Sequence, residues 1–293
     1  MKKMIMTIKE ALIWAKKELG RAKIKTSALD AEVLLSFILK KPREWIYLNL
    51  KFSPNSSPRF RTLANGYKKL IARRKKHEPV AYITRNKEFY GLDFYVDRNV
   101  LIPRPETEIL VEQALKTIDN LQLTTDKITI ADVGTGLGNI AVSLAKNIKG
   151  NCKIYATDIS EKILKMAKKN AKKHKVSKKI KFLKGSFLNP LKEKVDIVVS
   201  NPPYVPKSDK VSREVKYEPK NSVFMPDKNF QEKLIYQINE KLKTGGLAFL
   251  EIGKGQKKKI ENLVKKIMPR AKTEFIKDYS GIYRVAKILK IND

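Results

Sequence analysis

Four consecutive residues, Asn201, Pro202, Pro203 and Tyr204, combine groups that are suited to binding an amino group. Each proline lacks a backbone N–H but keeps its carbonyl, and the asparagine adds a side-chain carbonyl, so the segment is rich in hydrogen-bond acceptors. The tyrosine supplies a flat ring on which a planar group can stack. If the segment binds a ligand, we expect that ligand to present an NH2 group. The alternative is an ordinary turn at the end of the apolar segment 195–200.

A second candidate site is the glycine-rich segment 132–138, in which Gly134, Gly136 and Gly138 alternate with other residues. Glycines allow the backbone to approach a ligand closely, with its amides pointing outward. The spacing differs from the Gly-x-Gly-x-x-Gly of dinucleotide-binding folds. Asp158 closes the next apolar segment, where a carboxylate can accept both hydroxyls of a ribose.

The glycine-rich segment and Asp158 together predict a nucleoside cofactor. S-adenosylmethionine fits the glycine spacing better than NAD, because the loop must then hold an amino-acid tail rather than a pyrophosphate. A glycine-rich turn that binds nothing is the alternative. Phe187, which follows the third predicted strand, either covers one face of the adenine or packs as an ordinary core aromatic.

The elements that must position these residues follow from the hydrophobic pattern after residue 127. Apolar β-branched segments alternate with helical ones, which predicts an α/β fold with a mainly parallel sheet and helices on both faces. Ligands in such sheets bind at the carboxyl ends of the strands, where both candidate segments lie. The predicted strands are 128–133, 153–157, 180–184, 195–200, 247–252, 273–277 and 283–288, and the predicted helices are 138–148, 161–174, 228–242 and 256–268.

The first part of the chain predicts a separate helical bundle over residues 1–78. Thr7 to Glu10 has the pattern of a capping box, and apolar residues follow it at helical spacing. Aromatic and β-branched residues around Gly91 then indicate a β-hairpin in a linker, residues 79–102, before a catalytic domain, residues 103–293. The bundle lacks a catalytic constellation, so we expect it to be structural or to bind a partner.

The composition is strongly basic, with a formal net charge of +33. Such a charge favours a polyanionic partner such as ribosomal RNA, or an acidic protein, and a nearby ribosome or RNA is one interpretation. Most of the basic residues are lysines, so solvated helix faces explain the charge equally well.

Cysteine and histidine usage argues against a metal site or an internal disulfide. Cys152 is the only cysteine, which fits a reducing cytoplasm, and His77 and His174 lie far apart in lysine-rich surroundings. The sequence also lacks a run of about 18 apolar residues that could cross a membrane, and its N-terminus lacks the apolar core of a signal peptide. We therefore expect a cytoplasmic protein without a metal.

Several ordered motifs resemble those of the HemK/PrmC family of protein-glutamine methyltransferases. The similarity spans roughly residues 78 to 290, whereas the N-terminal bundle is similar only in size and helical character. The motifs are Arg-Pro-Glu-Thr-Glu at 104–108, the glycine-rich segment, Asn-Pro-Pro-Tyr, Glu218-Pro219 and Asp-Tyr-Ser-Gly-Ile-Tyr-Arg at 278–284.

This resemblance implies a class I S-adenosylmethionine-dependent methyltransferase fold with a seven-stranded sheet and an N-terminal helical bundle. The implied activity is methylation, in translation termination, of the glutamine in the Gly-Gly-Gln motif of class 1 peptide chain release factors, which the bundle would dock. The residues that would bind S-adenosylmethionine are Gly134, Thr135, Gly136, Leu137, Gly138, Asp158, Phe187 and Asn201. Those that would bind the glutamine are Asn201, Pro202, Pro203, Tyr204 and Arg104, of which Asn201, Pro202 and Tyr204 would be catalytic.

An amide nitrogen is a poor nucleophile because its lone pair is delocalised into the carbonyl, so positioning must supply much of the rate. We expect the Asn201 side-chain oxygen and the Pro202 carbonyl to accept the two N–H groups and to stabilise the charge that develops on nitrogen. Tyr204 would pack against the amide plane.

Three other functions remain compatible with these residues. One is methylation of a glutamine in a large-subunit ribosomal protein. Another is methylation of an amino group in DNA or RNA, which the charge and the shared Asn-Pro-Pro-Tyr segment permit, although a flipped base needs a recognition region that is not evident. The third is a ribosome-binding protein that has lost catalysis, and the intact glycine-rich segment and Asp158 argue against it.

Overall fold

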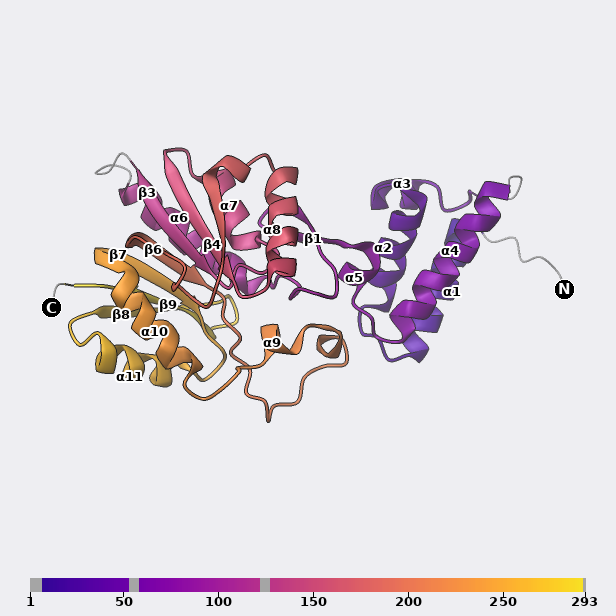
Figure 1. Cartoon of the computed structure of the whole chain (residues 1–293). Coiled ribbons are helices and arrows are strands. Elements are labelled where there is room, and N and C mark those ends of the chain that lie inside the picture. The colour runs from indigo at the N-terminus through magenta and orange to yellow at the C-terminus, as the bar shows by residue number, and fades with distance from the viewer. Residues whose placement is uncertain (1–6, 53–57, 122–126, 292–293) are drawn as a thin grey trace. The chain divides into compact units, whose positions relative to one another are not determined.

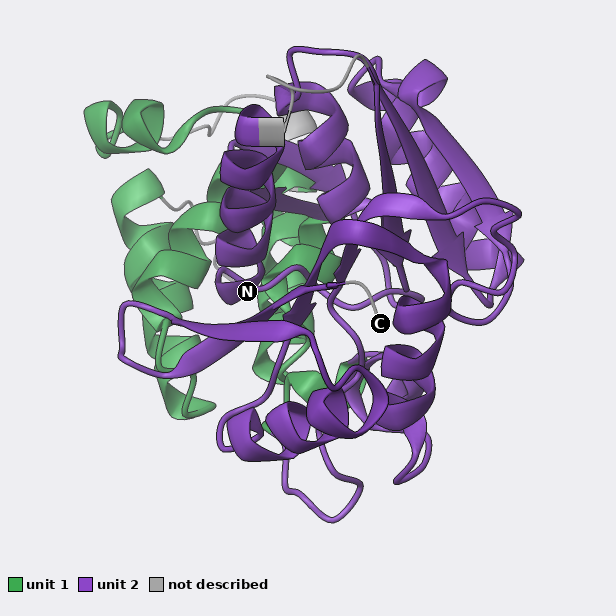
Figure 2. Ribbon diagram, turned by 90° about the vertical axis from the view of Figure 1, so that its left-hand side faces the viewer, with its two compact units in different colours: residues 1–85, 212–217 green, residues 86–211, 218–293 purple. Residues whose placement is uncertain are grey.

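The computed structural model describes residues 7–52, 58–121 and 127–291, which form two compact units. The helical unit consists of residues 1–85 and 212–217, and the sheet unit consists of residues 86–211 and 218–293 (Figure 2). The short segment 212–217 therefore belongs to the helical unit, although the sequence places it deep in the predicted catalytic domain.

Within the residues that the structure describes, the helical unit contains five α-helices (Figure 1). The predicted capping box is present, because the Thr7 hydroxyl accepts from the Glu10 backbone while the Glu10 carboxylate accepts from the Thr7 N–H at 2.7 Å. Apolar side chains such as Leu19, Leu34 and Ile71 are fully buried between the helices. The helices are α1 (Ile8–Arg21), α2 (Ser27–Leu39), α3 (Arg43–Leu48), α4 (Pro58–Lys75) and α5 (Val80–Thr84).

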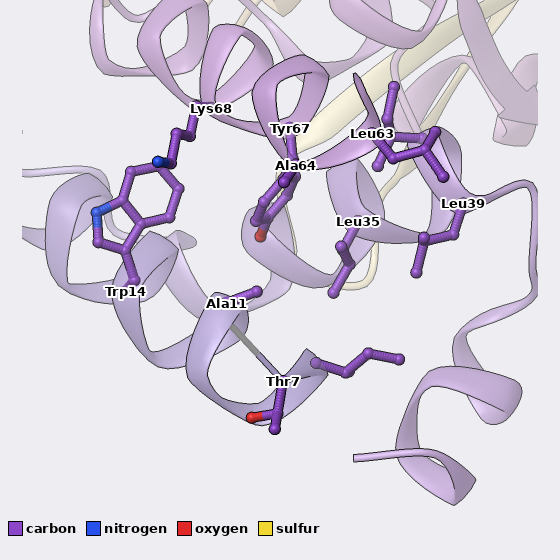
Figure 3. Close-up of a pocket in the computed structure, with 11 residues that line it drawn as sticks. Thr7, Ala11, Trp14, Leu35, Leu39, Leu63, Ala64, Tyr67 and Lys68 are labelled. Atoms are coloured by element: carbon purple, nitrogen blue, oxygen red, sulfur yellow. The ribbon is translucent and has the colours of Figure 1, made fainter. Parts of the chain in front are cut away.

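A small apolar cavity lies between α1, α2 and α4 (Figure 3). Its walls include Trp14, Leu35, Leu63 and Tyr67. The cavity measures about 60 Å³, far below the volume of a pocket for an organic ligand. It is a gap in packing rather than a candidate site.

The segment 212–217 is fixed to the helices by a buried arginine. Arg74 on α4 donates to Asp30 on α2 at 2.7 Å and to Glu214 at 2.5 Å. The Tyr217 hydroxyl donates to the Lys76 carbonyl at 2.7 Å. These contacts join residues that are distant in the sequence, so local sequence patterns do not predict that the segment belongs to this unit.

The boundary between the units differs from the predicted linker. Residues 80–84 form α5, whose Ile83 packs into the helical core, so the helical unit extends to Arg85. The predicted hairpin exists as β1 (Asn86–Phe89) and β2 (Leu92–Tyr95). It belongs to the sheet unit rather than to a linker, because Asn170 bonds both the N–H and the carbonyl of Tyr95.

The sheet unit is built on a seven-stranded sheet of order β5-β4-β3-β6-β7-β9-β8. Its strands are β3 (Ile128–Val133), β4 (Cys152–Asp158), β5 (Ile180–Lys184), β6 (Val195–Ser200), β7 (Leu242–Glu251), β8 (Lys272–Lys277) and β9 (Tyr283–Leu289). Neighbours from β5 through β7 are parallel, and β9 is antiparallel to β7 and β8. The predicted mainly parallel, seven-stranded sheet is confirmed.

Helices cover both faces of this sheet (Figure 1). On one face, Leu234, Ile238 and Val264 of α10 and α11 pack against Ala131 and Val198. The alternate residues of the strands face the layer of α6, α7 and α8. The helices are α6 (Glu106–Leu121), α7 (Asn139–Asn147), α8 (Glu161–Lys173), α10 (Phe230–Lys241) and α11 (Lys257–Ile267).

Local structure departs from the prediction in a few short segments. Strand β7 begins at Leu242 rather than 247, because Leu242 already pairs with Val195 of β6 before a register shift. Pro219 precedes a short helix, α9 (Lys220–Val223), which lacks a periodic signal in the sequence. Among the described residues, none of the helices combines the length and apolar character needed to cross a membrane.

Candidate active site

The two candidate segments lie at the carboxyl ends of adjacent strands, β3 and β6. Along the sheet, β4 and β5 follow β3 on one side, and the chain then returns to place β6 on the other side. The carboxyl edge of such a switch point is where open α/β sheets bind ligands. A cavity of about 510 Å³ lies there and is lined by residues of both segments. This volume falls in the range of sites for cofactors and other small molecules.

The glycine-rich loop has a backbone that only glycine adopts readily at three positions. Gly134, Gly136 and Gly138 have φ angles of 71°, 55° and 86°. Gly134 and Gly136 line the cavity, with Thr135 and Leu137 between and after them. Gly138 does not line it; instead, a Cβ at this position would meet the Cβ of Ala167 on α8 at 3.2 Å. Gly138 therefore permits close helix packing behind the loop.

Asp132 anchors the glycine-rich loop from inside. Its carboxylate is fully buried and accepts from the Thr135 hydroxyl at 2.6 Å and from the Ala141 N–H at 3.1 Å. Burial raises the pKa of Asp132 to about 7, against the effect of these two hydrogen bonds. A buried acid thus holds the loop from its inner side.

Asp158 ends β4 and lines the same cavity. Its carboxylate accepts from the Ser160 N–H at 3.0 Å and from the Gly136 N–H at 3.3 Å. Burial raises the pKa of Asp158, and these backbone hydrogen bonds lower it in part. The predicted ribose-binding acid therefore also joins the two loops that follow β3 and β4.

Phe187 lines the cavity after β5. Its ring packs edge-on against Phe230 with centroids 4.9 Å apart, and its carbonyl accepts from the Thr157 hydroxyl at 2.7 Å. Its φ of 47° is unusual for a side chain of this size. Phe187 thus borders the cavity and also packs against the core, and its contact with an adenine stays a prediction.

Asn201 lines the cavity, and its side chain is held by a short chain of hydrogen bonds. Its Nδ2 donates to the Thr107 hydroxyl at 2.9 Å, and that hydroxyl donates to Glu251 at 2.6 Å. The Tyr204 hydroxyl donates to the other oxygen of Glu251 at 3.2 Å. Thr107 comes from the first turn of α6 and Glu251 from the end of β7.

The backbone of the Asn-Pro-Pro-Tyr segment is fixed from a second side. Gln256 donates to the Tyr204 carbonyl at 2.8 Å, while its own side-chain oxygen accepts from Gly253 and Gln231. Pro202 and Pro203 line the cavity. Tyr204 does not line it, and its hydroxyl points to Glu251 instead. Burial raises the pKa of this hydroxyl.

Arg104 lies outside the residues that line the cavity. Its guanidinium pairs at 2.5 Å with Glu218, a buried acid that also accepts from the Ile102 N–H at 3.1 Å. Arg104 therefore helps to fix the segment before α6 to the segment before α9. A role in binding substrate stays a prediction.

Three residues of this site were not predicted from the sequence: Thr107, Glu251 and Gln256. Thr107 stood inside a recognised motif without a role. Glu251 closes an apolar strand that neighbours β6, so the rule that functional groups gather at carboxyl ends of parallel strands could have found it. Gln256 had no such signal. Among the described residues, histidine, cysteine, aspartate and glutamate do not cluster in threes as a metal site requires.

The cavity fits a nucleoside cofactor with an amino-acid tail. A glycine backbone borders it on one side, the Asp158 carboxylate can accept ribose hydroxyls, and the Phe187 ring is available to a base. A seven-stranded sheet of this order, with a glycine-rich loop after β3, defines the chain as a class I methyltransferase.

Comparison with known proteins identifies the family. Residues 10–84 match the model of the PrmC N-terminal domain, and residues 124–269 match that of a methyltransferase domain. A release factor glutamine methyltransferase of Dictyoglomus turgidum is 36% identical over 98% of this chain and 99% of its own length. One of Coxiella burnetii is 36% identical over 96% of this chain and 98% of its own. The chain belongs to the family of release factor glutamine methyltransferases.

Solved structures share the fold at low sequence identity. The catalytic domain of hMettl16 superposes with a TM-score of 0.53 at 18% identity, covering 73% of this chain and 81% of that one. The 16S rRNA N2 G1207 methyltransferase RsmC of T. thermophilus, solved with AdoMet and guanosine, gives 0.51 at 15% identity, covering 70% and 49%.

Proposed function

We propose that this chain transfers a methyl group from S-adenosylmethionine to the side-chain amide nitrogen of the glutamine in the Gly-Gly-Gln motif of class 1 peptide chain release factors. One observation carries the proposal: the glycine-rich loop and the Asn-Pro-Pro-Tyr segment open onto one cavity at the ends of β3 and β6. Relatives that match nearly the whole chain bear the name of this activity.

In this proposal, the glycine-rich loop, Asp158 and Phe187 hold the cofactor. Gly134 to Leu137 offer close backbone approach, and the Asp158 carboxylate accepts ribose hydroxyls. The bound cofactor supplies an electrophilic methyl group. The chain's own contribution is to bind and orient both partners.

Asn201 and Pro202 act on the glutamine amide. Two acceptors, the Asn201 Oδ1 and the Pro202 carbonyl, receive its two N–H groups and fix the plane of the amide. As its nitrogen gains positive charge, the same two dipoles stabilise that charge within a site already organised for it. Tyr204 contributes through the shape of the segment and its bond to Glu251.

The helical unit docks the release factor in this proposal. Support comes from large apolar side chains on its surface: Ile13, Leu29, Phe37, Tyr47, Leu48 and Phe52 are all exposed. Leu48 is 84% exposed, which is unusual for leucine and suits a surface that a protein partner covers.

Labelled S-adenosylmethionine tests the activity with three acceptors: a release factor, its Gly-Gly-Gln→Gly-Gly-Ala version, and duplex DNA. We expect label on the first alone. Label on DNA would favour the amino-group methyltransferase of nucleic acids, and equal label on both proteins would place the methyl group on another residue.

A further inference from the structure

The chain of hydrogen bonds behind Asn201 has one possible direction when Glu251 is ionised. A carboxylate only accepts hydrogen bonds, so the Thr107 hydroxyl must use its single proton toward Glu251, 2.6 Å away. The hydroxyl is then an acceptor toward Asn201, 2.9 Å away. The amide group of Asn201 that faces Thr107 must therefore be the NH2, and Oδ1 lies on the other side.

This direction matters because the two ends of an asparagine amide have nearly the same shape but opposite hydrogen-bonding character. With Oδ1 toward the cavity, Asn201 accepts from a substrate NH2. With the amide turned over, it would present N–H groups to N–H groups. Asn201 itself contributes little to this choice, so residues behind it must make it.

We propose that Thr107 and Glu251 are positioning residues that set the orientation of the Asn201 amide, and that this orientation selects an NH2-bearing acceptor. The proposal rests on the proposed function, since it takes Asn201 as the group that receives the substrate amide. Neither residue touches the reacting atoms. Both are about 1% exposed, so solvent does not compete for their hydrogen bonds.

The surroundings of Glu251 support this role. Tyr204 donates to its second oxygen, Arg284 on β9 favours its charge, and Glu106 on α6 disfavours it. Burial raises the pKa of Glu251 to about 7, against the hydrogen bonds from Thr107 and Tyr204. A protonated Glu251 could donate to Thr107, which would free the threonine proton to point at Asn201 and favour the reverse orientation.

The test compares Thr107→Val, Thr107→Ser and Glu251→Gln in the full chain, with the release factor as acceptor. Valine keeps the shape but removes the hydroxyl, and glutamine can donate to Thr107 and so reverse the direction. We expect kcat to fall on the order of 10- to 100-fold in both, with the affinity for S-adenosylmethionine unchanged. Thr107→Ser should restore kcat to within about threefold, since serine keeps the hydroxyl.

A matched control is Thr129→Val. The Thr129 hydroxyl also donates to a carboxylate, that of Asp196, at 2.6 Å. This pair lies at the amino end of β3, whereas the cavity lies at its carboxyl end. We expect this variant to keep the kcat of the unmodified protein. Equal kcat in Thr107→Val and Thr129→Val would overturn the proposed role, as would a full kcat in Glu251→Gln.

The pH profile adds a readout that a purely structural role would not change. The kcat of the unmodified protein and of Thr107→Ser should rise with pH as Glu251 loses its proton, whereas that of Thr107→Val should not. An equal rise of kcat with pH in Thr107→Val would contradict the proposal. If the unmodified protein methylates no release factor, the proposed function fails, and this result is distinct from an active protein whose kcat ignores Thr107.

Discussion

Asn201 shows how a single side chain can define the kind of group that a site accepts. Its Nδ2 donates to Thr107, and in the orientation that we propose its oxygen faces the cavity that Asn201 lines. Acceptors without donors fit a primary amide or an aromatic amine. The acceptor character of the site could be predicted from the four residues 201–204. The orientation of the amide depends on Thr107 of α6 and Glu251 of β7, which are distant from it in the sequence.

Asp158 should contribute to binding S-adenosylmethionine through its free acceptor capacity. Asp158→Ala removes a carboxylate at the cavity and also its bonds to Gly136 and Ser160. We expect affinity for the cofactor to fall roughly 10- to 100-fold, as the loss of hydrogen bonds to a charged group implies. Isothermal titration calorimetry measures this, with Asp196→Ala as a control carboxylate at the far end of the sheet. Equal affinity in Asp158→Ala and the control would contradict the assignment.

The two buried acids predict how stability depends on pH. Burial raises the pKa of both Asp132 and Glu251 to about 7, so the folded protein binds more protons than the unfolded chain between about pH 4 and 7. Their contribution to the free energy of unfolding is therefore full at about pH 4 and is lost as pH rises through 7.

Chemical denaturation at pH 5, 6, 7 and 8 checks this dependence. Glu251→Gln removes one of the two acids, so we expect the difference in unfolding free energy between the variant and the unmodified protein to shift in favour of the variant as pH rises, by a few kcal/mol at most. A difference that is constant over this range would show that Glu251 keeps an ordinary pKa.

At the scale of elements, the site depends on loops that are joined to one another behind the cavity. Asn170 on α8 is fully buried and donates to the carbonyls of Leu137 and Tyr95, while its oxygen accepts from the Tyr95 N–H. One side chain thus ties the glycine-rich loop, the β1–β2 hairpin and α8 together.

Asn170→Ala should destabilise the sheet unit. The change leaves three backbone groups without their partner, one of them buried and two partly buried, and a buried group costs about 1–3 kcal/mol when it finds no other. We expect the free energy of unfolding to fall by roughly 2–4 kcal/mol, because water can reach part of the space. Denaturant melts of Asn170→Ala and of Asn147→Ala, an asparagine on α7 with one helical backbone contact, give the comparison. Equal stability would contradict the account.

The elements themselves were largely predictable, because their signals are local. All seven strands and the long helices follow from hydrophobic periodicity and helix caps. Glycines with positive φ marked the loop after β3. Short helices such as α5 and α9 were missed, since five or four residues carry too little periodicity. The order of the strands in the sheet was not predicted, because it is set by contacts between segments that are distant in the sequence.

At the scale of the whole molecule, the two units have different roles in the proposed function. The sheet unit contains every residue that lines the cavity, and the helical unit carries most of the exposed large apolar side chains of the described chain. The segment 212–217 runs from the sheet unit into the helical unit and back. The segment belongs to the helical unit through contacts between residues that are more than a hundred positions apart in the sequence, and local sequence patterns do not reveal such contacts.

Docking through the helical unit predicts a selective effect on KM. In the double variant Phe37→Ser and Leu48→Ser, two exposed apolar side chains are removed while the cavity is left intact. We expect KM for the full-length release factor to rise roughly 10-fold, with kcat nearly unchanged, because such contacts bind rather than react. Tyr236→Ser on α10 is the control, an exposed aromatic of the sheet unit. An unchanged KM in the double variant would place docking elsewhere.

The central claim is that the acceptor groups around Asn201 direct a methyl group to the amide nitrogen of a release factor glutamine. Fragmentation mass spectrometry of the product locates that methyl group. With the unmodified protein, we predict a single methyl on the side-chain amide of the Gly-Gly-Gln glutamine, and with Asn201→Ala, which should still bind S-adenosylmethionine, a rate lower by roughly 100-fold or more. A methyl on another residue, or equal rates for the two proteins, would contradict the claim.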